Sequence, residues 1–152
     1  MSNDFMPRWE RYLVIPLVKM HDTIYQKTGG RIGHRILLGA PPSLLLHTLG
    51  AKTGLPRTTS LSYAKDGDSY LLAASNGGGP NAPGWYFNLQ ASPDVEINVG
   101  PKRMPTTARI IGEDHPDYRR LWKLVNDNSA NRYDRYQKRT KRPIPIIALT
   151  PR

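Results

Sequence analysis

The feature that most restricts the fold is a series of short strand-like segments separated by turn residues. The predicted strands cover residues 43–49, 57–65, 69–75, 95–99, 104–111 and 143–149. Asp66-Gly67-Asp68 is a tight-turn signal, so segments 57–65 and 69–75 are expected to pair as a β-hairpin. Prolines at the start of the last segment predict a sheet edge or the beginning of a strand. Strands at this spacing, without the alternating helices of a parallel sheet, predict a mainly β, α+β fold: a small antiparallel barrel with peripheral helices.

Four segments are predicted to be helical: residues 6–26, residues 84–90, the region after Pro116 and the region after Ser129. A chain of 152 residues has the length of one ordinary domain. We assign residues 31–152 to this barrel domain and residues 1–30 to an N-terminal helical unit that precedes it. In the N-terminal unit, aromatic and basic side chains alternate at roughly helical spacing. That pattern is typical of a helix that packs on its own domain, and a peripheral membrane contact is the alternative.

The chain lacks the side chains of most self-sufficient catalytic sites. It has no cysteine, which excludes disulfides, thiolate metal sites and a cysteine nucleophile. Its four histidines are at least 13 residues apart with no carboxylate pattern beside them, so no metal site is expected. Neither a Gly-x-Ser-x-Gly elbow nor a catalytic pair of carboxylates stands out. Any chemistry is therefore expected to come from a bound cofactor.

The chain is also strongly basic. With 22 Lys and Arg against 12 Asp and Glu, its formal net charge is +10. Such a charge indicates an anionic partner, which could be a phosphate, a carboxylate-rich ligand, nucleic acid or acidic lipid. No apolar run approaches the roughly 20 residues of a membrane-spanning helix, and Asp4 and Glu10 argue against a secretory signal. A cytoplasmic location is expected.

Two glycine-containing segments are candidates for ligand binding. Residues 50–58 place Lys52 and Arg57 in a strand-to-strand turn with two glycines and a proline, which is either an anion cradle or an ordinary cationic turn. Residues 75–83 contain three consecutive glycines, which either let the backbone approach a flat ligand closely or form a mobile surface loop. Trp85 follows this loop and either floors a pocket or belongs to the core.

The third candidate is the segment from Asn131 to Arg142, which carries six basic residues and one acidic residue. Within it, Tyr133 and Tyr136 are three residues apart and share a face of the predicted helix. The pattern is open to three interpretations: binding of single-stranded nucleic acid, an anionic ring ligand stacked on the tyrosines, or a solvated helix face.

Four motifs follow one another along the chain: GAKTGLPR at residues 50–57, ASNGG at 74–78, PGWYFNLQASPDV at 83–95, and a tail with Tyr133, Tyr136 and RPIPI at 142–146. In this order they resemble the deazaflavin-dependent nitroreductase family, within the flavin/deazaflavin oxidoreductases. The resemblance covers about residues 40–150. It implies a split β-barrel of the FMN-binding-like type.

The resemblance also implies an activity. The implied protein is an oxidoreductase that binds the 8-hydroxy-5-deazaflavin coenzyme F-420, with FMN as the alternative, and moves a hydride between its C5 atom and an organic acceptor. Quinones, activated enones and nitro compounds are the implied acceptors, and no nucleic acid partner is expected. The implied coenzyme-binding residues are Lys52, Thr53, Gly54, Pro56, Arg57, Thr58, Ala74, Ser75, Asn76, Gly77, Gly78, Gly84, Trp85 and Asn88. The implied catalytic residues are Ser75, Tyr133 and Tyr136.

Two positions depart from the pattern of the family. Asn76 stands where a lysine often follows the loop serine, which weakens one anion contact, and Ala130 stands where some members carry a third tyrosine, which opens the acceptor pocket. Nitroimidazole reduction is therefore less expected than coenzyme binding. A non-catalytic lipid- or flavin-binding split barrel and a basic nucleic-acid-binding module remain alternative functions. Either a monomer or a homodimer is expected.

Overall fold

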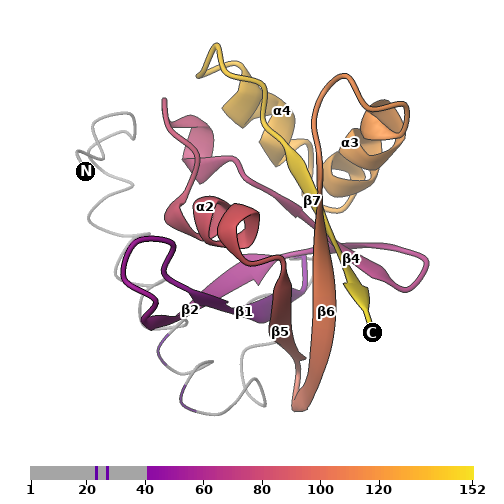
Figure 1. Ribbon diagram of the computed structural model, residues 1–152. Coiled ribbons are helices and arrows are strands. Elements are labelled where there is room, and N and C mark those ends of the chain that lie inside the picture. Colours follow the sequence, from indigo (N-terminus) through magenta and orange to yellow (C-terminus); the bar gives the residue numbers. More distant parts are fainter. Residues whose placement is uncertain (1–22, 24–26, 28–40) are drawn as a thin grey trace.

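The computed structural model describes Thr23, Lys27 and residues 41–152 (Figure 1). The predicted N-terminal helix, the division at residue 30 and the alternative of a peripheral membrane contact therefore fall largely outside the described residues. Among the described residues, no helix is long and apolar enough to cross a membrane.

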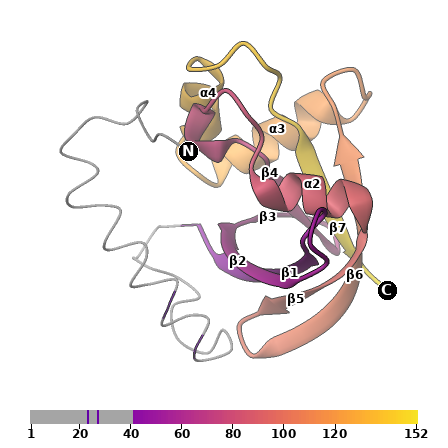
Figure 2. The ribbon, with the colours of Figure 1, turned by 60° about the vertical axis from the view of Figure 1, so that its left-hand side comes forward.

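A seven-stranded antiparallel sheet, curled into a half-barrel, forms the framework (Figures 1 and 2). Its strands are β1 (Ser43–Leu49), β2 (Pro56–Ser62), β3 (Ala64–Asp66), β4 (Ser69–Ala73), β5 (Asp94–Val99), β6 (Lys102–Ile111) and β7 (Ile146–Pro151). Their order across the sheet is β2-β1-β5-β6-β7-β4-β3. The sequence prediction of an antiparallel barrel-like fold is confirmed.

The predicted single strand 57–65 is wrong, because the segment breaks at Tyr63. Residues before the break, in β2, pair with β1, whereas the residues after it, in β3, pair with β4. The expected hairpin is therefore limited to Ala64–Asp66 opposite Ser69–Leu71. The Tyr63 amide donates to the Pro42 carbonyl at 3.0 Å, and its buried ring contacts Tyr70 edge to face. One chain segment thus supplies both outer strands of the sheet, which explains how the sheet can curl.

The last strand lies inside the sheet rather than at its edge. β7 pairs with β6 on one side and with β4 on the other. Pro143 and Pro145 both precede β7, where their missing amide donors cost no ladder hydrogen bond. Of the two positions that the prolines predicted, the start of the strand is confirmed and the edge of the sheet is wrong.

Helices cover both faces of the sheet. They are the short 3-10 helix η1 (Asn76–Gly78), α2 (Gly84–Ala91), α3 (Tyr118–Asp127) and α4 (Arg132–Gln137). In Figure 2, α2 lies against the curled sheet beside β1, whereas α3 and α4 lie together on the side of β4 and β7. Side chains therefore alternate between two cores: Leu72 packs with Trp85 of α2, and its neighbour Leu71 packs with Leu121 of α3. Because both faces of β4 are buried, its sequence is almost continuously apolar.

Candidate functional site

The turn between β1 and β2 carries the first group of predicted binding residues. It is closed by two backbone hydrogen bonds of 2.8 Å, from Gly50 to the Leu55 carbonyl and from Gly54 to the Gly50 carbonyl. Gly54 has φ +68, a left-handed conformation that favours glycine. The side chains of Lys52 and Arg57 project from this turn and are exposed, with no ion-pair partner among the described residues. The expected strand-to-strand turn that presents Lys52 and Arg57 is confirmed.

Asn88 of α2 fixes the position of this turn. Its side-chain oxygen accepts from the Ala51 amide at 2.9 Å, and its side-chain nitrogen donates to Thr48 Oγ1 at 3.1 Å. Both ends of the carboxamide are therefore occupied by protein groups. The geometry gives Asn88 the role of a tether between helix and turn, although it was predicted to touch a cofactor.

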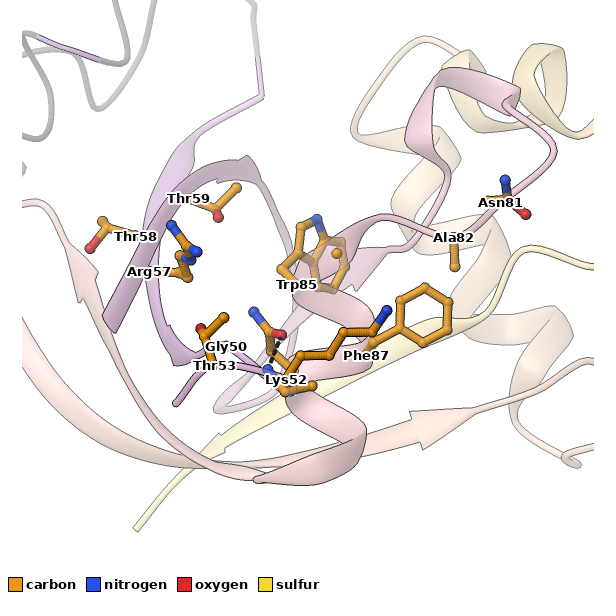
Figure 3. A pocket seen from close by; sticks show the side chains of 13 residues that line it. Gly50, Lys52, Thr53, Arg57, Thr58, Thr59, Asn81, Ala82, Trp85 and Phe87 are labelled. Carbon is orange, nitrogen blue, oxygen red and sulfur yellow. Dashed lines mark hydrogen bonds between the residues drawn. The ribbon is translucent and has the colours of Figure 1, made fainter. Parts of the chain in front are cut away.

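A cavity of about 730 Å³ opens between the β1–β2 turn and the start of α2. Figure 3 shows Trp85 near its centre, with Arg57, Thr58 and Thr59 to one side and the side chains of Lys52 and Phe87 to the other. Trp85 is only 8% exposed and also belongs to the core under α2, so this residue both lines a pocket and packs in the core. The cavity thus combines an aromatic wall with two cations that have no ion-pair partner in the described part of the chain, a combination that suits a ligand with a ring and an acidic group.

The loop after β4 approaches the same region with an unusual backbone. Asn76, Gly77 and Gly78 have φ values of +46, +64 and +82, so three successive residues are left-handed. A Cβ atom on Gly78 would lie 2.6 Å from the carbonyl oxygen of Tyr136, which means that the loop packs directly against α4. Glycine is required at this position for both reasons. The second alternative for this loop, a mobile surface loop, does not fit such close packing.

Arg142 holds this loop in place through hydrogen bonds to its backbone. Its guanidinium donates to the carbonyl oxygens of Ala74, Ser75 and Gly79 at distances between 2.9 and 3.2 Å. Burial lowers the pKa of this arginine, and the nearby Tyr86 opposes that effect. The sequence analysis placed Arg142 in a family motif but gave it no role, because its partners lie more than 60 residues away.

A second cavity of about 410 Å³ lies between β2, β4, the loop and α4. All three predicted catalytic residues line it: Ser75, Tyr133 and Tyr136. The two tyrosine rings meet edge to face with centroids 6.1 Å apart, which confirms that they share a helix face. Trp85 lines both cavities, so the two adjoin at this residue.

The structure separates the predicted coenzyme-binding residues into three groups. Lys52, Thr53, Arg57, Thr58, Gly84 and Asn88 line the first cavity, together with Trp85. Ser75, Asn76 and Gly77 line the second. Gly54, Pro56, Ala74 and Gly78 line neither and shape the two loops instead.

Sequence reasoning missed several lining residues. Thr59 and Phe87 line the first cavity, and Ser60, Ser62 and Arg132 line the second. Ser60 and Ser62 lie in a segment that was predicted as one unbroken strand, and nothing in its local pattern indicated that this part of β2 lines a cavity. His47, a titratable residue near the site, has both ring nitrogens occupied by Thr58 and Asn98, and across the described residues no cluster of three acidic or histidine side chains could hold a metal ion.

Known proteins resemble this chain along most of its length. The family model described as F420H(2)-dependent quinone reductase matches residues 17–151. An F420H(2)-dependent quinone reductase of Mycobacterium tuberculosis is 64% identical over 146 residues, which is 95% of this chain and 97% of the relative.

Two solved structures show the same likeness in three dimensions. One, described as an F420-H2 dependent reductase (FDR-A), is 36% identical with a TM-score of 0.63 and covers 71% of this chain and 93% of its own. Another, described as a domain-swapped dimer, is 32% identical with a TM-score of 0.65 and covers 88% and 97%. The cytoplasmic location and the choice between monomer and homodimer stay predictions. The chain belongs to the F420H(2)-dependent quinone reductase family.

Proposed function

We propose that this protein reduces quinones with the reduced coenzyme F-420, and that the coenzyme occupies the two adjoining cavities. The observation that supports this most is that Trp85 lines both the cavity that holds Lys52 and Arg57 and the cavity lined by two tyrosines. A ligand that passes this indole would place its acidic part beside Lys52 and its ring beside Ser75. When bound, the coenzyme supplies a hydride to the acceptor.

Lys52 and Arg57 are the residues that would hold the acidic part of the coenzyme. Both are exposed, and neither has an anionic partner among the described residues, so an incoming phosphate or carboxylate need not displace one. Thr53 and Thr58 line the same cavity and offer hydroxyl groups to the same oxygens. Charge-assisted hydrogen bonds of this kind are stronger than neutral ones.

The loop of residues 75–78 and Trp85 would flank the ring of the coenzyme. Gly77 has no side chain, so the backbone of the loop can approach a flat ligand closely. Arg142 holds the loop carbonyls, so the position of Ser75 does not have to be fixed by the ligand. The chain thus pre-orients the ring before the reaction, which lowers the entropic part of the barrier.

Tyr133 and Tyr136 would face the acceptor. Tyr133 is only 7% exposed, and the second cavity beside it is partly enclosed by protein, which limits the access of water. A phenol in this position can donate a hydrogen bond to an acceptor oxygen as charge develops there. Quinones are the acceptors named by the family. Activated enones and nitro compounds carry similarly placed oxygens and are the next acceptors to test.

The proposal is tested by fluorescence titration with oxidised coenzyme F-420, with FMN in a parallel titration. Lys52→Ala and Arg57→Ala are each expected to weaken coenzyme binding about tenfold, the order of a hydrogen bond to a charged group. Lys138→Ala is the matched control, since it removes a charge from an exposed residue that lines neither cavity, and its affinity should stay within about twofold. Absence of coenzyme binding, or equal binding of FMN, would overturn the proposal and favour the non-catalytic flavin-binding alternative.

A further inference from the structure

Arg132, the first residue of α4, lines the second cavity, which is called the acceptor cavity below, but it has no role in the function proposed above. Among the described residues that line this cavity, it is the only one with a charged side chain. Its neighbours there are Ser60 and Ser62 from β2 and the two tyrosines of its own helix.

The guanidinium of Arg132 has few partners. One of its five N–H groups donates to Tyr133 Oη at 3.2 Å, and its Cζ atom lies 5.1 Å from the centre of the Tyr133 ring. Its Nε atom is buried without a hydrogen-bond partner among the described residues. Other arginines differ: Arg120 pairs with both oxygens of Asp66, and Arg142 meets three carbonyl groups.

An arginine that is partly buried and short of acceptors is costly to maintain, so it indicates a ligand that completes its bonding. The backbone before it is strained as well, because Ala130 and Asn131 are both left-handed, with φ +52 and +58. Hydrogen bonds nevertheless hold this turn, from the Asn131 amide to the Asn126 carbonyl and from the Arg135 side chain to the Ala130 carbonyl. Strain that is held in place next to a cavity is typical of functional sites.

We infer that Arg132 is a catalytic residue that binds the acceptor oxygen on which negative charge develops. This inference rests on the proposed function and deepens it. When a hydride adds to one carbonyl oxygen of a quinone, the electron pair of the hydride forms the new O–H bond. The π electrons of the quinone shift through the ring, and the opposite oxygen becomes a phenolate. A proton from solvent then completes the hydroquinone.

Arg132 can stabilise that phenolate with the N–H groups that have no partner among the described residues, and Tyr133 can act beside it. The oxygen of Tyr133 accepts a hydrogen bond from Arg132, so the phenolic hydrogen remains available to donate. The two side chains together would form a donor pair for one oxyanion, in a cavity where such donors are worth more than in water.

The test measures binding rather than turnover. The probes are 2-hydroxy-1,4-naphthoquinone, which is an anion at neutral pH, and its neutral 2-methoxy analogue. Both are titrated with and without oxidised coenzyme F-420, which cannot deliver a hydride. Wild-type protein is expected to bind the anion at least about tenfold more tightly than the neutral analogue, and Arg132→Gln is expected to reduce this ratio to within about threefold of unity.

Two further variants separate this role from a structural one. Arg132→Lys keeps the charge and should retain part of the preference, whereas Lys138→Gln removes an exposed charge outside the cavity and should leave the ratio unchanged. The inference is overturned if Arg132→Gln leaves the ratio of the two affinities unchanged. It is also overturned if the wild-type protein does not prefer the anion, or if it binds neither probe. The coenzyme titration tests the proposed function separately. If the preference for the anion depends on Arg132 but the protein does not bind the coenzyme, the anion site at Arg132 is supported and the proposed reductase activity is contradicted.

Discussion

At the scale of single residues, Arg142 shows how one side chain can determine the shape of a binding loop. Its planar group reaches three carbonyl oxygens at once, which a lysine ammonium at the same position cannot do. We expect Arg142→Lys to lower the free energy of unfolding by about 1–3 kcal/mol and to weaken coenzyme binding about tenfold, although the charge is kept. Urea unfolding and the coenzyme titration measure the two effects.

Arg103→Lys is the control for that substitution. Arg103 lies on the exposed surface, where it pairs with Glu96, so its replacement should change stability by no more than about 0.5 kcal/mol. If Arg142→Lys bound the coenzyme like the wild type, the loop would not depend on the forked geometry.

The site residues that could be predicted from the sequence are those that lie in continuous motifs. Lys52, Arg57, Ser75 and Trp85 were selected from such motifs, in which a short segment of chain carries both the turn and the side chain. Each of them lines a cavity, and their part in coenzyme binding stays a prediction. The role of Arg132 could not be predicted, since it depends on which strands and loops face α4. Local spacing contains no information about such distant neighbours.

At the scale of elements, the contact between η1 and α4 joins the loop after β4 to the helix that carries Tyr133 and Tyr136. Gly78→Ala would add a Cβ atom 2.6 Å from the Tyr136 carbonyl oxygen in a backbone with φ +82. We expect a loss of about 2–4 kcal/mol in unfolding free energy, from steric overlap and left-handed strain together. The KM for quinone should also rise, because α4 must move to admit the new atom.

Gly67→Ala is the matched comparison. Gly67 has φ +58, but a Cβ atom there would have no neighbour within 4 Å, so only the strain of about 1–2 kcal/mol applies. Equal losses in the two variants would mean that the packing of η1 against α4 contributes nothing.

Elements also show where the sequence prediction stopped being adequate. Residues 57–65 alternate as one strand should, and nothing local marks the change of partner at Tyr63. That break follows from the curl of the whole sheet, because the two halves of the segment, β2 and β3, form its two opposite edges. The helices α2 and α3 were predicted well from local signals: a proline follows the end of α2, and α3 has apolar residues at helical spacing after Pro116.

At the scale of the whole molecule, Tyr118 links α3 to the chain that enters β7, and it makes global stability depend on pH. Its hydroxyl donates to the Ile144 carbonyl at 2.6 Å. Burial, and to a lesser extent Glu113, raises the pKa of Tyr118 from 10.0 to about 12. The folded state therefore favours the neutral phenol, so this stabilisation is complete below pH 10 and is lost as the pH rises towards 12.

Tyr118→Phe tests that pH dependence. The variant lacks the hydrogen bond and should be less stable than the wild type at pH 8 by about 1 kcal/mol. The difference should shrink between pH 10 and 12, because only the wild type loses the contribution of this phenol. Urea unfolding at several pH values measures it, and a constant difference across that interval would contradict the assignment.

The central position of β7 has a consequence for the order of folding. In the described sheet, β4 and β3 are hydrogen-bonded to the other strands through β7 alone. β4 precedes β7 by more than 70 residues, so this pairing closes a long loop and is expected to form slowly. Until it forms, the cation-bearing turn and the loop after β4 belong to separate parts of an unfinished sheet. The coenzyme can then bind only a late intermediate or the native state, so it would protect the finished protein without guiding its early assembly.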